Sequence, residues 1–178
     1  MEEIARMVGI SKKTIYQEFL DKKDLVTEVF KEILEEDRKK MVLILEQEDG
    51  VIDHLVKVFQ VIRERLSSIN PMVIVEIQKY FPEAWKMFEN FKKQEIMRDL
   101  IIVMEKGKRL GYFREEIDTA ILARVRMDQI TSAFDPVHFA DPEYNFVEEQ
   151  LVLMDHFLHG IFTEKGRLAY YSQKAFQN

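Results

Sequence analysis

Turn-forming residues are scarce in this chain of 178 residues, which holds only six glycines and four prolines. This is about half the usual share of these two residue types. β-Sandwiches and β-barrels need more of them, because their many short strands are joined by turns. Apolar residues instead recur at spacings of three and four, as at Leu25, Val29 and Ile33, which is the period of a helix with one buried face. The sequence therefore predicts an all-α fold.

Composition narrows the class of protein. The chain has no cysteine, which excludes disulfide scaffolds, cysteine-ligated metals and thiol catalysis. No apolar run approaches the roughly 18 residues of a membrane span, and the acidic Glu2 and Glu3 stand where a secretory signal would be basic. We therefore expect a cytoplasmic protein with no membrane partner. The net charge of −6 argues against a nucleic-acid binder that uses its whole surface, but it leaves room for a small DNA-reading patch.

Capping residues divide the chain into helices. The expected N-caps are Ser11, Asp21, Asn70 and Asp118, and the expected helix ends include Gly9 and Gly111. The predicted helices cover about 2–8, 12–18, 22–47, 51–68, 71–80, 82–110, 119–134 and 143–160, with a last short helix after Thr163. Residues 71–80 are apolar on most sides and are expected to be buried. The two short helices lie at the start of the chain, and a break follows the connecting helix at Gly50, so we divide the chain into 1–47 and 48–178.

Two short helices joined by Gly9 predict a helix-turn-helix, whose second helix projects far enough to enter the major groove of DNA. Lys22, at the start of the next helix, is expected to clamp a phosphate together with backbone N–H groups. The alternative is an ordinary pair of solvated helices, since residues 1–25 carry five basic and five acidic side chains. The side chains of the second helix suit phosphate and base-edge contacts, and glutamine can read adenine; they are Ser11, Lys12, Lys13, Thr14, Tyr16 and Gln17.

These residues resemble the signature of the TetR family of bacterial repressors. The matching positions, in order, are Ile4-Ala5, Val8-Gly9-Ile10-Ser11-Lys12, Thr14-Ile15-Tyr16, Phe19, Lys22 and Leu25. Lys13 departs from the pattern, because the family often has glycine or another small residue there. The resemblance implies a ligand-responsive repressor that binds a palindromic operator DNA as a homodimer. It also implies a three-helix DNA-binding domain, and since the family has one more helix ahead of this motif, we expect the chain to lack the first helix. The end of the chain resembles a frequent closing pattern of such regulators at Phe157, Gly160-Ile161, Thr163 and Lys165-Gly166.

The last two long helices are apolar on more than one side, which is typical of helices that are buried on more than one side. The resemblance implies that they form a four-helix bundle across a two-fold axis. Core helices of a monomer are the alternative. The expected dimer interface comprises Met127, Ile130, Phe134, Leu151, Met154 and Leu158.

The middle of the chain is rich in aromatic residues and methionine, as ligand pockets are. These side chains predict a pocket for a small apolar or amphipathic effector, unless they simply fill the core. Glu76 is expected to meet a polar group of the ligand, although a surface position is the alternative. The candidate pocket residues are Phe59, Ile62, Glu76, Tyr80, Trp85, Phe88, Met104 and Met127.

Metal and catalytic signals are weak. His156 and His159 lie three residues apart beside Asp155, a spacing that can hold a metal, but no second set of ligands completes the site. No nucleophile–base pair, phosphate loop or pair of catalytic carboxylates is evident. We therefore expect no metal, no cofactor and no enzyme activity. The alternative to a DNA-binding regulator is a helical small-molecule binding protein without a DNA role.

Overall fold

The computed structural model describes residues 1–46, 50–141 and 143–175, and within them it contains helices and no strand. The all-α prediction is confirmed. In chain order the elements are α1 (Glu2–Val8), α2 (Lys12–Glu18), α3 (Lys22–Glu46), α4 (Val51–Ser68), α5 (Pro71–Tyr80), α6 (Pro82–Phe91), the π turn η1 (Lys92–Ile96), α7 (Met97–Arg109), α8 (Thr119–Ser132), the 3-10 turn η2 (His138–Ala140), α9 (Phe146–Ile161) and α10 (Glu164–Ala175).

The predicted helix ends follow from local hydrogen bonding. Gly9 and Gly111 both have a φ of 72°, the left-handed conformation that ends a helix at little cost for glycine. The predicted end of the long third helix, at residue 47, lies outside the described residues. A side-chain oxygen of each predicted N-cap accepts a backbone hydrogen bond from the following turn, at Ser11, Asp21, Asn70 and Asp118.

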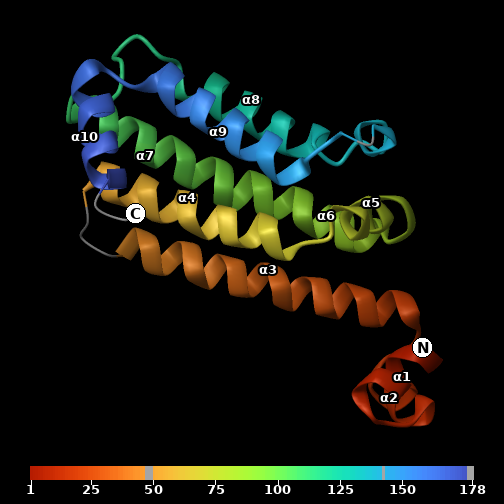
Figure 1. The fold of residues 1–178 in the computed structure, drawn as a ribbon. Coiled ribbons are helices and arrows are strands. Elements are labelled where there is room, and N and C mark those ends of the chain that lie inside the picture. The colour runs from red at the N-terminus through yellow and green to blue at the C-terminus, as the bar shows by residue number, and fades with distance from the viewer. Residues whose placement is uncertain (47–49, 142, 176–178) are drawn as a thin grey trace.

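The long helices lie side by side. Figure 1 shows α3, α4, α7 and α9 running along one another, while α8 packs against α7 and α10 against α4. Helices α1 and α2 lie at the N-terminal end of α3, at the opposite end of the molecule from α10 (Figure 1). With 25 residues, α3 is about 38 Å long and connects the two ends.

The main core lies between α4, α7, α9 and α10. A short antiparallel contact joins the segment after α7 to the end of α9: Arg114 N–H donates to the Ile161 carbonyl at 2.9 Å, and Thr163 N–H donates to the Tyr112 carbonyl at 2.9 Å. This contact ties α10 to the bundle. The most deeply buried side chains of this core are Val51, Met104, Phe113, Leu158, Ile161 and Tyr170.

The predicted helix over 82–110 is continuous, but it contains a π turn that the sequence did not indicate. Residues 92–96 adopt this wider turn between α6 and α7. The wider turn accommodates one extra residue, and such turns occur frequently at functional sites. Lys92, the first residue of the turn, is 3% exposed.

The expectation that residues 71–80 are buried was wrong. In α5 only Val75 and Ile77 are buried, whereas Met72 and Val73 are 45% and 49% exposed. The reason is that α5 packs against α6 through one side, where Ile77 joins Phe30, Leu34 and Ala84. A short helix at the edge of a bundle has no second neighbour to cover its other apolar side.

Candidate functional site

Helices α1 and α2 pack as the helix-turn-helix prediction requires. Ala5 of α1 and Ile15 of α2 are both buried, at 5% and 4% exposed. Between the helices, the Ile10 N–H donates to the Ala5 carbonyl at 3.0 Å. This hydrogen bond and the left-handed Gly9 fix the angle of the turn, so that α2 holds one face against α1 and the rest of its surface faces solvent.

The six predicted DNA-contacting residues of the second helix all lie on that exposed surface. Ser11 and Thr14 form the helix cap, with 2.8 Å between their hydroxyl oxygens. The Lys12 ammonium lies 6.0 Å from the centre of the Tyr16 ring, a cation–π distance. The exposed set is Ser11, Lys12, Lys13, Thr14, Tyr16 and Gln17.

Lys22 is exposed at the start of α3, but the backbone N–H groups expected to help it are already engaged. Asp21 Oδ1 accepts from the N–H groups of Lys23 and Asp24, at 2.7 and 2.9 Å. Asp24 Oδ2 in turn accepts from the Leu20 N–H at 2.8 Å. A phosphate at this helix start therefore meets the Lys22 ammonium rather than a free backbone cradle.

Helix α3 is joined to the bundle by apolar and ionic contacts. Its Phe30 and Leu34 pack with Ala84 of α6. Asp37 Oδ2 lies 3.0 Å from Arg65 Nη2 of α4. Burial raises the pKa of the Asp37 carboxyl, and the Arg65 guanidinium opposes this shift without cancelling it.

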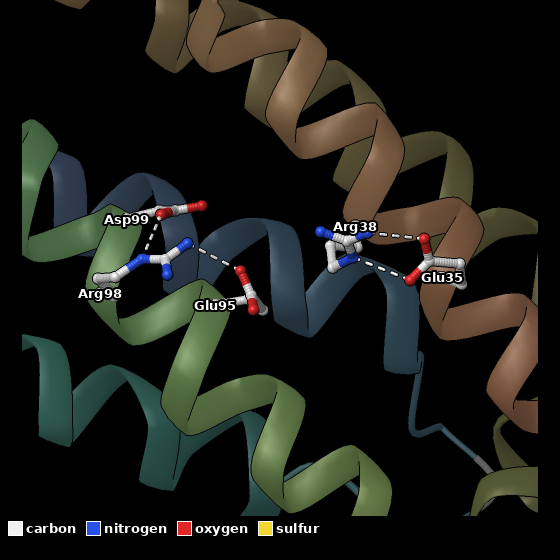
Figure 2. Close-up of polar contacts among 5 residues, drawn as sticks. All are labelled: Glu35, Arg38, Glu95, Arg98 and Asp99. Carbon is white, nitrogen blue, oxygen red and sulfur yellow. Dashed lines mark hydrogen bonds and ion pairs between the residues drawn. The ribbon is translucent and has the colours of Figure 1, made fainter.

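Three further ion pairs lie on α3 and around the start of α7. Figure 2 shows Glu35 and Arg38 paired along α3, and Arg98 of α7 between Glu95 and Asp99. The hydrogen bond from Glu35 raises the pKa of Arg38, and the negative charge of Glu95, on the π turn, adds a smaller effect.

The predicted pocket residues do not gather around one space. Glu76 and Tyr80 are exposed on the uncovered side of α5, away from the buried residues of the predicted pocket. Phe59 and Ile62 are half-buried on α4, while Met104 and Met127 are buried on α7 and α8. Trp85 and Phe88 instead pack against a separate cluster of Ala133, Phe134 and Phe146.

Two described hollows lie elsewhere. One, of about 440 Å³, is lined by the start of α4, Tyr112 and α10. The other, of about 450 Å³, is an open hollow near Glu105, Lys108 and Asp118. Neither contains a residue from the predicted pocket.

Five polar residues are buried among those that the structure describes, and sequence reasoning singled out none of them; three lie inside apolar stripes. Lys92, Arg126 and Gln150 are 3%, 7% and 4% exposed. Burial lowers the pKa of the Arg126 guanidinium to about 10. Their positions in apolar stripes were a detectable signal, because Arg126 lies between Ala123 and Ile130, and Gln150 lies between Phe146 and Met154.

The predicted dimer residues mostly face the interior of their own chain. Met127, Phe134, Met154 and Leu158 are buried, and Ile130 and Leu151 are half-buried. The interface prediction at these positions remains untested. The exposed apolar side chains of these helices are Ile121 and Val125 on α8 and Val152 on α9, at 52%, 45% and 61% exposed.

His159 has partners of its own. Its Nε2 lies 3.6 Å from Asp155 Oδ2 and 3.1 Å from the Tyr171 hydroxyl. Within the described part of the chain, no three histidine or carboxylate groups converge as metal ligands. Across the same residues, no helix combines the length and the apolar character needed to cross a bilayer.

Comparisons with known proteins find similarity to a curated protein and to solved structures that are named as transcriptional regulators. No family model matches the chain. A curated protein of Bacillus subtilis strain 168, the uncharacterized HTH-type transcriptional regulator YvaF, is 22% identical over 168 residues, which cover 93% of this chain and 86% of the relative.

Two solved structures share the fold. The ketosteroid transcriptional regulator KstR2 of Mycobacterium tuberculosis superposes with a TM-score of 0.64 at 20% identity, covering 92% of this chain and 84% of that one. The transcriptional regulator FadR from Bacillus subtilis, solved in complex with stearoyl-CoA, gives a TM-score of 0.60 at 17% identity, covering 89% and 84%.

Proposed function

The chain has the fold of TetR-type transcriptional regulators, and on that premise we propose that it is a ligand-responsive repressor. It binds a palindromic operator as a homodimer through α2 and Lys22. A small amphipathic effector enters the helical bundle and changes the DNA affinity. The protein acts in the cytoplasm, where its operator lies.

The single observation that carries this proposal is the exposed face of α2. Lys12, Lys13, Tyr16 and Gln17 project from a helix that is buried only through Ile15. Lysine and tyrosine suit phosphate contacts. The glutamine amide has one donor and one acceptor, which match the N7 acceptor and the N6 donor that adenine presents in the major groove. The helix stands at the end of α3, clear of the bundle (Figure 1), as entry into a groove requires.

Effector binding is supported by the neighbours and by the aromatic content of the bundle. FadR was solved with stearoyl-CoA, a molecule with a long apolar chain and a charged end. For the effector to regulate, it must bind the DNA-bound and DNA-free conformations with different affinities, by about 1–3 kcal/mol in ordinary cases. Its binding energy reaches α2 through α3, which packs on α4 and α6.

Dimerisation through α8 and α9 is supported by their exposed apolar residues. Ile121 and Val125 lie four apart on one side of α8, and Val152 is exposed on α9. A two-fold axis at such a surface presents two α2 helices to the half-sites of a palindrome at a fixed spacing.

The test is selection of operator DNA from a random pool, followed by fluorescence anisotropy with the selected duplex at two salt concentrations. We expect binding that weakens as salt rises, because lysine–phosphate contacts release counterions. Failure to enrich any sequence, together with affinity no greater than that of an unrelated helical protein of equal charge, would contradict the proposal. Ligand binding without any DNA binding would instead favour the small-molecule carrier.

A further inference from the structure

Three hydrogen-bond donors are buried in the bundle from three different segments. They are the Lys92 ammonium on the π turn, the Arg126 guanidinium on α8 and the amide of Gln150 on α9, each more than nine-tenths buried. Burying a charged group costs free energy unless the group is paired. Burying an amide donor costs free energy unless the donor is hydrogen-bonded. The partners of these three donors are therefore informative.

Each of the three lies four residues along the chain from a residue of one aromatic cluster, which is formed by Ala133, Phe134 and Phe146 with Trp85, Phe88 and Ile130 packed against it. The Lys92 Nζ atom lies 6.0 Å from the centre of the Trp85 ring and 5.3 Å from that of Phe88. Arg126 precedes Ile130 by four residues on α8, and Gln150 follows Phe146 by four residues on α9. Each donor is thus one helical turn, along its own segment, from a residue of the same apolar cluster.

Their charge is only partly compensated. Lys92 Nζ donates to the Thr131 hydroxyl and lies 2.7 Å from Glu89 Oε1, close enough for an ion pair although not aligned as a hydrogen bond. Among the described residues, Arg126 has one long contact, 3.4 Å from its Nη1 to Gln129 Oε1. The Gln150 Nε2 atom is buried without a hydrogen-bond partner.

We propose that Lys92, Arg126 and Gln150 bind the anionic group of an amphipathic effector, whose apolar part packs on the aromatic cluster. All three groups are donors, and two are cations, so the chemistry that satisfies them is a carboxylate or a phosphate. The π turn directs Lys92 inward, while Glu95, three residues later, faces the charges of Arg38 and Arg98. An anion at Lys92 therefore acts on the same π turn that carries Glu95. The regulatory part of this inference rests on the proposed function, but the binding site does not.

Trp85 provides a direct readout, because it is the single tryptophan of the chain and lies against the Lys92 ammonium. Its fluorescence is recorded, in the absence of DNA, during titration with hexanoate, decanoate, palmitate and decyl phosphate, and with 1-decanol as the uncharged analogue. We expect saturable binding of at least one anion, at least about tenfold tighter than 1-decanol. The tighter of decanoate and decyl phosphate identifies whether a carboxylate or a phosphate is preferred.

The variants Lys92→Met and Arg126→Met are each expected to weaken anion binding at least about tenfold. Their matched controls are Lys93→Met and Arg124→Met, because Lys93 and Arg124 are exposed on the same turns; these should bind as the wild type does. Thermal melting checks that each variant folds, and Lys92→Gln, which removes the charge but keeps a polar side chain, replaces Lys92→Met if the latter does not fold.

Three results would overturn the proposal: no saturable binding of any of the anions, binding of 1-decanol as tight as that of decanoate, or equal losses in the buried and exposed variants. These results are separate from the DNA measurement. A chain that binds decanoate through Lys92 and Arg126 but selects no operator keeps the anion site and loses the repressor role.

Discussion

Asp37 on the connecting helix α3 and Arg65 on α4 form an ion pair, with 3.0 Å between Oδ2 and Nη2, and a second contact of 3.1 Å from Arg65 Nε. Both side chains are mostly buried, at 23% and 29% exposed. Because burial raises the pKa of Asp37 despite this partner, the ionised carboxyl does not gain enough from Arg65 to offset its desolvation.

The first prediction is an asymmetry between the two members of this pair. Asp37→Asn should change the free energy of unfolding at neutral pH by less than about 1 kcal/mol, because it removes the desolvation cost together with the ion pair. Arg65→Met should destabilise the protein by about 1–2 kcal/mol, because it leaves the carboxylate buried and unpaired. Urea unfolding measures both, and equal losses in the two variants would contradict the interpretation.

The second prediction concerns Tyr170, which is 1% exposed. Burial raises the pKa of its hydroxyl from 10.0 to about 12. The unfolded chain therefore loses this proton more readily than the folded one. The contribution to stability is complete below pH 10 and is lost as the pH rises towards 12. Between about pH 9 and about pH 11 the wild type should lose about 1 kcal/mol more than Tyr170→Phe. Urea unfolding of both proteins at the two pH values measures the difference, and parallel losses would rule out this role for Tyr170.

The third prediction concerns two glycines near the end of the chain. A Cβ atom at Gly166 would overlap the carbonyl oxygen of Tyr112, so Gly166→Ala should destabilise the protein by about 2–3 kcal/mol. The same atom at Gly160, on the exposed side of α9, meets nothing within 4 Å. Gly160→Ala is the matched control and should stabilise the helix by about 0.5 kcal/mol. Melting curves of the two variants measure both effects. A similar loss of stability in both variants would show that a Cβ atom at Gly166 fits without a clash.

The fourth prediction separates phosphate contacts from base contacts on α2. Lys12→Ala and Lys13→Ala should each reduce the slope of log affinity against log salt by about one, on any DNA sequence. Gln17→Ala should cost about 1–3 kcal/mol on the selected operator and little on other DNA. Lys39→Ala, an exposed lysine farther along α3, is the control. If Lys39→Ala changes the salt slope as much as the α2 variants do, the salt effect comes from the overall charge of the protein and not from contacts of α2.

The fifth prediction concerns the dimer. Val125→Asp and Val152→Asp should shift the protein from dimer to monomer in sedimentation at micromolar concentration, because a buried unpaired carboxylate opposes association. Val137→Asp is the control, since Val137 is 69% exposed after α8. If the wild type itself sediments as a monomer at every concentration, dimerisation through this surface is excluded.

Local chemistry made the helix ends predictable from the sequence. A cap such as Ser11 or Asp118 interacts with the backbone within three residues, so no knowledge of the rest of the fold is needed. The exposed face of α2 followed in the same way, from two short helices and one glycine turn.

Long-range packing decided what the sequence did not predict. Whether Tyr80 is covered depends on whether a second element reaches the outer side of α5, and none of the local residues specifies that. The inward direction of Arg126 was visible as a charged residue inside an apolar stripe. Its role in the proposed anion site depends on Lys92 and Gln150, which are distant in the sequence and are buried on other segments of the fold.

The π turn sets the alignment of everything that follows it in the helix. From α6 to α7, inward positions recur every four residues, at Ala84, Phe88, Lys92, Ile96, Leu100 and Met104, although a regular helix advances 3.6 residues per turn. The extra residue absorbed by 92–96 helps to maintain this wider spacing. Deletion of one exposed residue there, such as Gln94, would rotate α7 by about 100° relative to α6. Met104, which is fully buried, would then turn away from the core. A single-residue deletion in this turn would therefore move the buried side chains of α7 to another face, as a one-residue register shift does in a β-strand.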